Sequence, residues 1–239
     1  MIGTIVNTVA IALGGLIGLL IKRGVPKHVE DAVMSSLGIG ILIVALNGVL
    51  SSMITVLPSG KLSDRGGLLL IISLAVGTLI GELLKIDDRL NLLGRMIETK
   101  LKVDGFAKGF ISSSLIFCVG AMSIIGPLND GLRGDSSVLF IKSALDGTTA
   151  LILASTLGVG VLFSAIPVLL YQGTIAMLAG VLTKAVSDDL LSMICMVGYA
   201  IVLCIGLNFI GSSKIKTANI IPALLVPVVY NMLMMLKTL

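Results

Sequence analysis

The chain has 239 residues, of which 56% are hydrophobic and 13% charged, and its formal net charge is +4. Soluble domains carry roughly 25% charged residues, so this composition excludes a water-facing surface and predicts a protein that crosses a bilayer several times. The positive charge does not indicate a nucleic-acid partner, because the lysines and arginines gather in short loops beside apolar runs, as in cytoplasmic loops of membrane proteins.

The apolar runs are long enough to cross a membrane as helices. We therefore predict an all-α, polytopic helical bundle with about seven or eight spans, in one integral membrane domain. The two spans within 137–183 depend on a break at Pro167, and a re-entrant hairpin is the alternative there. The expected spans cover residues 2–21, 32–57, 66–84, 109–128, 137–163, 167–183, 190–211 and 218–236.

Charge patterning predicts how the spans are oriented. Most basic residues lie in the loops 22–31, 85–108 and 212–217. The positive-inside rule makes these loops cytoplasmic, which puts both termini outside. Within the second loop, residues 88–103 alternate apolar and basic faces at helical spacing, which predicts an amphipathic helix on the cytoplasmic leaflet. A solvated connector helix is the alternative.

One short pattern recurs along the chain. ALGGLIGLLIK at 12–22 is repeated as AVGTLIGELLK at 75–85, and a weaker copy surrounds Gly180. The copies predict an internal duplication, in which the third would cross the membrane in the opposite sense, as in the inverted repeats of many transporters. The alternative for the third copy is chance, because small residues four apart are common in membrane helices. The expected helix-packing positions are Gly14, Gly18, Gly77, Gly81 and Gly180.

Two charged residues lie within one apolar run. Lys142 and Asp146 are one helical turn apart, although an ionised side chain at mid-bilayer costs at least about 2.5 kcal/mol. We predict that they form the centre of a solute- or ion-binding site; a structural ion pair that fixes helix register is the alternative. The uncharged polar side chains expected at this site are Asn7, Thr148, Thr149, Gln172 and Asn208.

Prolines mark the expected breaks in the spans. Each proline leaves a backbone carbonyl one turn earlier without its usual donor, and the broken helices of transporters use such carbonyls to coordinate ions. A kink that neighbouring helices satisfy is the alternative. The predicted break positions are Pro127, Pro167, Pro222 and Pro227.

Signatures of enzymes and metal sites are missing from the sequence. His28 is the single histidine, and the three cysteines are scattered through apolar runs. There is no phosphate-binding loop motif and no nucleophile elbow. We therefore expect no metal, no cofactor and no enzymatic activity.

Four segments together resemble a known family. They are GTIVNTVAIALGGLIG from residue 3, GPLNDGLRGD followed by KSALDG from residue 126, GVGVLFSAIPVLLYQG from residue 158, and GLNFIG followed by KTANIIPALLVPVVY from residue 206. They are similar to the bacterial inner-membrane proteins grouped as "domain of unknown function 554". The resemblance covers essentially the whole chain. It implies a location in the bacterial cytoplasmic membrane and implies no substrate.

These observations predict a secondary transporter or ion exchanger for a small solute. The alternative is a membrane scaffold or regulator that associates through its glycine faces, and a passive channel ranks lower because no filter motif is present. The expected partners are the lipid bilayer and the solute. The glycine faces would also suit a homodimer, although one subunit could use all of them internally.

Overall fold

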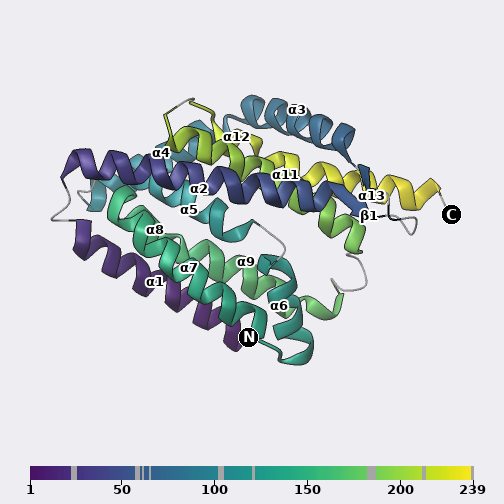
Figure 1. The fold of residues 1–239 in the computed structure, drawn as a ribbon, viewed down its shortest axis with the longest axis horizontal. Helices are drawn as coiled ribbons and strands as arrows, with labels where there is room; N and C mark the ends of the chain where they lie inside the picture. The colour runs from purple at the N-terminus through teal and green to yellow at the C-terminus, as the bar shows by residue number, and fades with distance from the viewer. Residues whose placement is uncertain are drawn as a thin grey trace. The chain divides into compact units, whose positions relative to one another are not determined.

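The structure, a computed structural model, describes residues 1–22, 26–56, 60, 62–64, 66–101, 105–119, 122–181, 187–211 and 214–237. The described chain is almost entirely helical, which confirms the predicted fold class (Figure 1). Its helices are α1 (Ile2–Lys22), α2 (Lys27–Met53), α3 (Gly67–Leu84), α4 (Ile86–Leu101), α5 (Phe106–Cys118), α6 (Met122–Arg133), α7 (Ser137–Leu157), α8 (Gly160–Phe163), α9 (Ala165–Met177), α11 (Asp188–Phe209), α12 (Thr217–Ile220), the 3-10 helix η1 (Ile221–Leu224) and α13 (Leu225–Lys237).

The number of spans agrees with the sequence. Within the described residues, seven helical segments are long and apolar enough to cross a membrane, and an eighth span arises if α5 and α6, bent by 61°, form one crossing. The chain divides into two compact units. Unit 1 comprises Met1–Met34 and Leu90–Ala185, and unit 2 comprises Ser35–Arg89 and Val186–Leu239.

Unit 1 is built on a close parallel pair, α1 and α7, which Figure 1 shows side by side. Gly3 of α1 lies against Leu139 near the start of α7, whereas Gly18 lies against Leu151 and Ala154 towards its end. A Cβ added at Gly14 would overlap the backbone carbonyl of Gly147. The glycines therefore let the two backbones approach to van der Waals contact over most of their length.

Helices α5 and α6 cross unit 1 once as a broken span. Gly109, near the start of α5, lies against Leu157 at the end of α7. At the other end, Gly126 of α6 lies against Leu139, and Met1 contacts Asp130 of α6. Because the pair leads from one end of α7 to the other, it is a bent crossing and not a hairpin that returns to its side of entry.

The crossing after α7 begins at a glycine. Gly158 has a φ of 83° and a ψ of −156°, a conformation that essentially only glycine adopts, and it ends α7. The segment Gly160–Met177, which comprises α8 and α9, then forms a second apolar crossing. The turn that leads into this crossing therefore lies at Gly158, and the shorter interruption at Ser164, between α8 and α9, lies just before the predicted break at Pro167. This proline lies in the first turn of α9, where its missing N–H is not needed.

The other prolines differ in their effects. The prediction that Pro127 ends a span is wrong, because α6 continues through it to Arg133. Pro222 does mark a break, since the helix tightens there into the 3-10 segment η1. Pro227 lies in the first turn of α13 and breaks nothing, for the same reason as the proline of α9.

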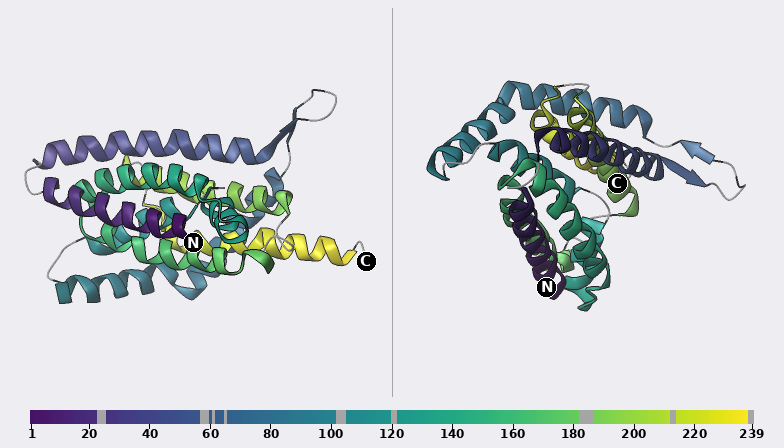
Figure 2. Two further views of the ribbon diagram at one scale, coloured as in Figure 1. Left: turned by 90° about the horizontal axis from the view of Figure 1, so that it is seen from below. Right: turned by 60° about the vertical axis from the view of Figure 1, so that its left-hand side comes forward.

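Unit 2 has its own close-packed helices. A Cβ added at Gly77 of α3 would overlap Ala223 of η1, and one at Gly81 would overlap the carbonyl of Asn219 of α12. Here the two segments run antiparallel, unlike α1 and α7. Gly38 and Gly48 of α2 lie against α11. The strands β1 (Ile54–Val56) and β2 (Leu62–Asp64) pair as an antiparallel hairpin after α2 (Figure 2).

Four of the five predicted packing glycines thus face the backbone of another helix. The fifth, Gly180, is exposed, and no atom of the described residues lies within 4 Å of an added Cβ, so it does not pack against another described helix. The amphipathic segment predicted over 88–103 corresponds to α4. The expected ends at 57, 103 and 183 lie outside the described residues.

Candidate solute-binding site

Four polar side chains from three helices of unit 1 meet in one buried cluster. The ammonium of Lys142 lies 2.8 Å from Oδ2 and 3.0 Å from Oδ1 of Asp146 on α7. The amide Nδ2 of Asn7 on α1 donates to Oδ2 of Asp146 at 3.1 Å and to Oε1 of Gln172 on α9 at 3.3 Å. The sequence indicated all four as site residues, and the fold brings them together.

The side chains of the cluster are buried, and two of their polar atoms make no hydrogen bond among the described residues. Asn7 and Gln172 have no exposed surface, and Lys142 and Asp146 are 6% and 7% exposed. Oδ1 of Asn7 and Nε2 of Gln172 have no hydrogen-bond partner within the described part of the chain. A buried polar atom without a partner costs about 1–3 kcal/mol, so two in one cluster point to a site that accepts a further polar group.

Helix α5, which ends at Cys118 before the break in the α5–α6 span, packs against α7, the helix that carries Lys142 and Asp146. Ser123 of α6 donates its hydroxyl to the carbonyl of Phe117 at 2.9 Å, which satisfies one free carbonyl at the end of α5. Irregular backbone at membrane depth is tolerated where protein buries it or where it lines a cavity.

A second buried carboxylate was missed by the sequence analysis. Asp130 of α6 is 4% exposed and accepts from the hydroxyl of Ser136 at 2.8 Å and from the backbone N–H of Thr4 at 3.4 Å. The amino group of Met1 lies 2.9 Å from its Oδ1. The signal was present: an aspartate follows Pro127 within an apolar stretch. It was overlooked because the span was expected to end at that proline.

The remaining predicted site residues lie elsewhere. Thr148 is exposed and donates its hydroxyl to the carbonyl of Ala144 in its own helix at 2.9 Å. Thr149 is half-buried and makes none of the four contacts that hold the cluster together. Asn208 belongs to unit 2, where its amide donates to the carbonyl of Ile215 and accepts from the N–H of Ile215, both at 2.8 Å. The prediction that places Thr148 at the site is therefore wrong, and the side-chain amide of Asn208 is occupied by the backbone of Ile215.

The geometry of Asn208 gives a first testable prediction. In Asn208→Leu, the N–H of Ile215 loses its partner and the carbonyl of Ile215 keeps only the N–H of Thr217, so we expect the free energy of unfolding to fall by about 1–3 kcal/mol. Activity per folded molecule should not change, because the amide of Asn208 bonds the backbone of Ile215 and makes none of the contacts of the cluster. Unfolding in detergent, followed with a thiol-reactive dye, and an activity assay on the same preparation would check both. Lost activity without lost stability would return Asn208 to the functional site.

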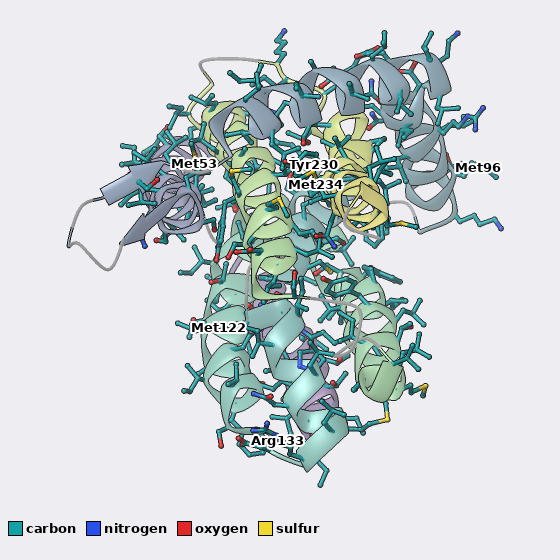
Figure 3. The ribbon with its side chains drawn as sticks, turned by 90° about the vertical axis from the view of Figure 1, so that its right-hand side faces the viewer. Met53, Met96, Met122, Arg133, Tyr230 and Met234 are labelled. Carbon is teal, nitrogen blue, oxygen red and sulfur yellow. The ribbon has the colours of Figure 1, made fainter. Side chains whose placement is uncertain are left out.

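Unit 2 contains a separate cavity of about 410 Å³. Among the described residues that line it, Asp189 is the one charged residue. Tyr230 and Met234, which Figure 3 labels on α13, also line it. None of the sequence-predicted site residues contributes to this cavity, so it is distinct from the cluster in unit 1.

Comparison with known proteins places the chain in a family. The family model described as "Protein of unknown function (DUF554)" matches residues 2–232. The "Uncharacterized membrane protein YdfK" of Bacillus subtilis (strain 168) is 35% identical over 227 residues, 95% of this chain and 94% of that protein. The "Uncharacterized protein YqgA" of Escherichia coli (strain K12) is 30% identical over 237 residues, 94% of each chain. No solved structure matches the chain. With its apolar helices and a match along nearly its whole length, the chain is a multi-pass membrane protein of the DUF554 family.

Proposed function

We propose that the chain is a secondary transporter or ion exchanger for a small solute, which binds at the Lys142–Asp146–Asn7–Gln172 cluster. One observation carries the proposal: four polar side chains, two of them charged, converge from three helices in a dry interior. Ionisable residues inside a membrane protein are costly to bury, and they mark substrate or ion pathways where they occur.

The broken α5–α6 span supports the same proposal. Substrate sites of secondary transporters lie near the bilayer midplane and are typically formed by discontinuous helices. Here α5, the first half of a span bent by 61°, packs against α7, which carries the buried charges. A rearrangement at such a break can open or close access without unfolding a regular helix.

The packing of the glycines favours transport over a scaffold role. Gly14, Gly18, Gly77 and Gly81 face backbone within their own unit, so they present no free surface for a partner helix. The location that fits the proposal is the bacterial cytoplasmic membrane, with both termini outside, as the distribution of basic residues favours.

Transport by reconstituted protein tests the proposal. We expect wild type in liposomes to move at least one solute saturably, and Asp146→Asn to abolish that movement. Solid-supported-membrane recording would screen protons, sodium, potassium, divalent metals, charged amino acids and organic anions, and labelled uptake would screen solutes without net charge.

Asp135→Asn is the matched control. It also removes one carboxylate, but from an exposed position before α7. There the hydroxyl and N–H of Ser137 lower the pKa of Asp135 by hydrogen bonding, so the group is ionised at neutral pH. This variant should transport as wild type does. Transport that survives in Asp146→Asn, or a wild type that moves nothing in the panel, would contradict the proposal.

A further inference from the structure

The charges of the cluster are balanced within it. Both oxygens of Asp146 lie within 3.0 Å of the Lys142 ammonium, and Oδ2 also accepts from Asn7. The carboxylate and the ammonium therefore neutralise each other before any solute binds. A solute with a net charge would add an unbalanced charge to a region of low dielectric, which is unfavourable.

The free hydrogen-bonding groups are a matched donor and acceptor. The orientations of the two amides follow from their contacts: Nδ2 of Asn7 faces the carboxylate of Asp146 and the Oε1 of Gln172. Turning the Asn7 amide would set its oxygen against the carboxylate, and turning the Gln172 amide would set two NH2 groups together. The groups left without partners are therefore one acceptor, Oδ1 of Asn7, and one donor, Nε2 of Gln172.

We propose that this cluster binds a small molecule without net charge that carries a hydrogen-bond donor and a hydrogen-bond acceptor close together, as in a primary amide, whose NH2 and carbonyl oxygen share one carbon, or a hydroxyl group, whose oxygen does both. The inference rests on the proposed function and narrows its substrate class. A bare cation would satisfy Oδ1 of Asn7 but leave the NH2 of Gln172 without an acceptor. An anion would satisfy the NH2 and repel the oxygen. A neutral donor–acceptor pair satisfies both atoms.

Ligand-dependent stability tests this inference without requiring transport. Unfolding in detergent can be followed with a thiol-reactive dye, because Cys195 is buried and becomes reactive only when the helices separate. The probes are acetamide, which has N–H donors and a carbonyl, and N,N-dimethylacetamide, which lacks the donors. We expect acetamide to raise the unfolding temperature of wild type by about 2–4 °C over the dimethyl analogue at equal concentration.

Two variants establish where the effect arises. Gln172→Leu removes both amide groups, and Gln172→Glu keeps the shape but replaces the NH2 donor. In each variant, acetamide and N,N-dimethylacetamide should change the unfolding temperature equally. A result from either variant that folds is enough for the test. Equal effects of the two amides on wild type, as expected of a site satisfied by water alone, would overturn the inference. So would a stabilisation by sodium or potassium chloride that these variants abolish. If the protein transports an ion saturably and the two amides have equal effects, the transporter proposal is retained and only the inference of a solute without net charge is rejected.

Discussion

Asp146→Leu is expected to lower the free energy of unfolding by about 3–5 kcal/mol, because it leaves the ammonium of Lys142 buried without its partner. Replacing both partners removes the charge as well as the attraction. The double variant Lys142→Met with Asp146→Leu should therefore unfold within about 1 kcal/mol of wild type, or be more stable, as apolar replacements of buried ion pairs often are. Denaturant titration of the detergent-solubilised protein would measure all three.

The double variant also separates the two interpretations of the ion pair. If Lys142 and Asp146 only fix helix register, a stable double variant retains transport. If they form the centre of the solute site, it folds and transports nothing. A single variant cannot decide this, because lost activity could follow from lost stability. A double variant that is as unstable as Asp146→Leu would show that the stranded charge is not the cause of the destabilisation.

The ion pair is the part of the site that local sequence predicts best. Residues four apart on a helix share a face, so Lys142 and Asp146 could meet within α7 whatever the rest of the chain did. Asn7 and Gln172 were predicted as site residues because they are polar residues within apolar spans, and no pattern in the sequence pairs them with Asp146. Their convergence depends on α1 lying parallel to α7 and on α9 returning beside α1, as the contacts in unit 1 show. Spacing along the chain carries no information about such pairing between distant segments.

The errors in the predicted span breaks have one physical origin. Prolines were given priority over glycines as break points. A proline in the first turn of a helix replaces an N–H that has no partner within that helix, so α9 and α13 continue through Pro167 and Pro227. Gly158 ends α7 instead, because its backbone conformation is forbidden to other residues. Because the span was expected to end at Pro127, Asp130 was not considered as a buried residue. It lies one turn beyond Pro127 in the same helix, α6.

Gly14→Ala is expected to destabilise the protein by about 1–3 kcal/mol, although alanine is the better helix former. The added methyl would overlap the carbonyl oxygen and carbon of Gly147, which belong to rigid helical backbone and cannot rotate away as a side chain could. The α1 and α7 backbones must then separate. Because Asn7 on α1 bonds Asp146 on α7, this separation should also reduce transport. Denaturant titration and uptake on the same preparation would measure both.

Gly180→Ala provides the matched control for this substitution. Gly180 corresponds to Gly18, one turn after Gly14, in its copy of the small-residue pattern, but it is exposed and an added Cβ there meets no atom of the described residues within 4 Å. Its substitution should change the free energy of unfolding by less than about 0.5 kcal/mol, as at most surface positions. If Gly14→Ala is equally mild, the tight packing of α1 on α7 does not limit stability. If it instead leaves the monomer stable and dissociates an oligomer, the glycine face serves association, and the scaffold hypothesis gains over transport.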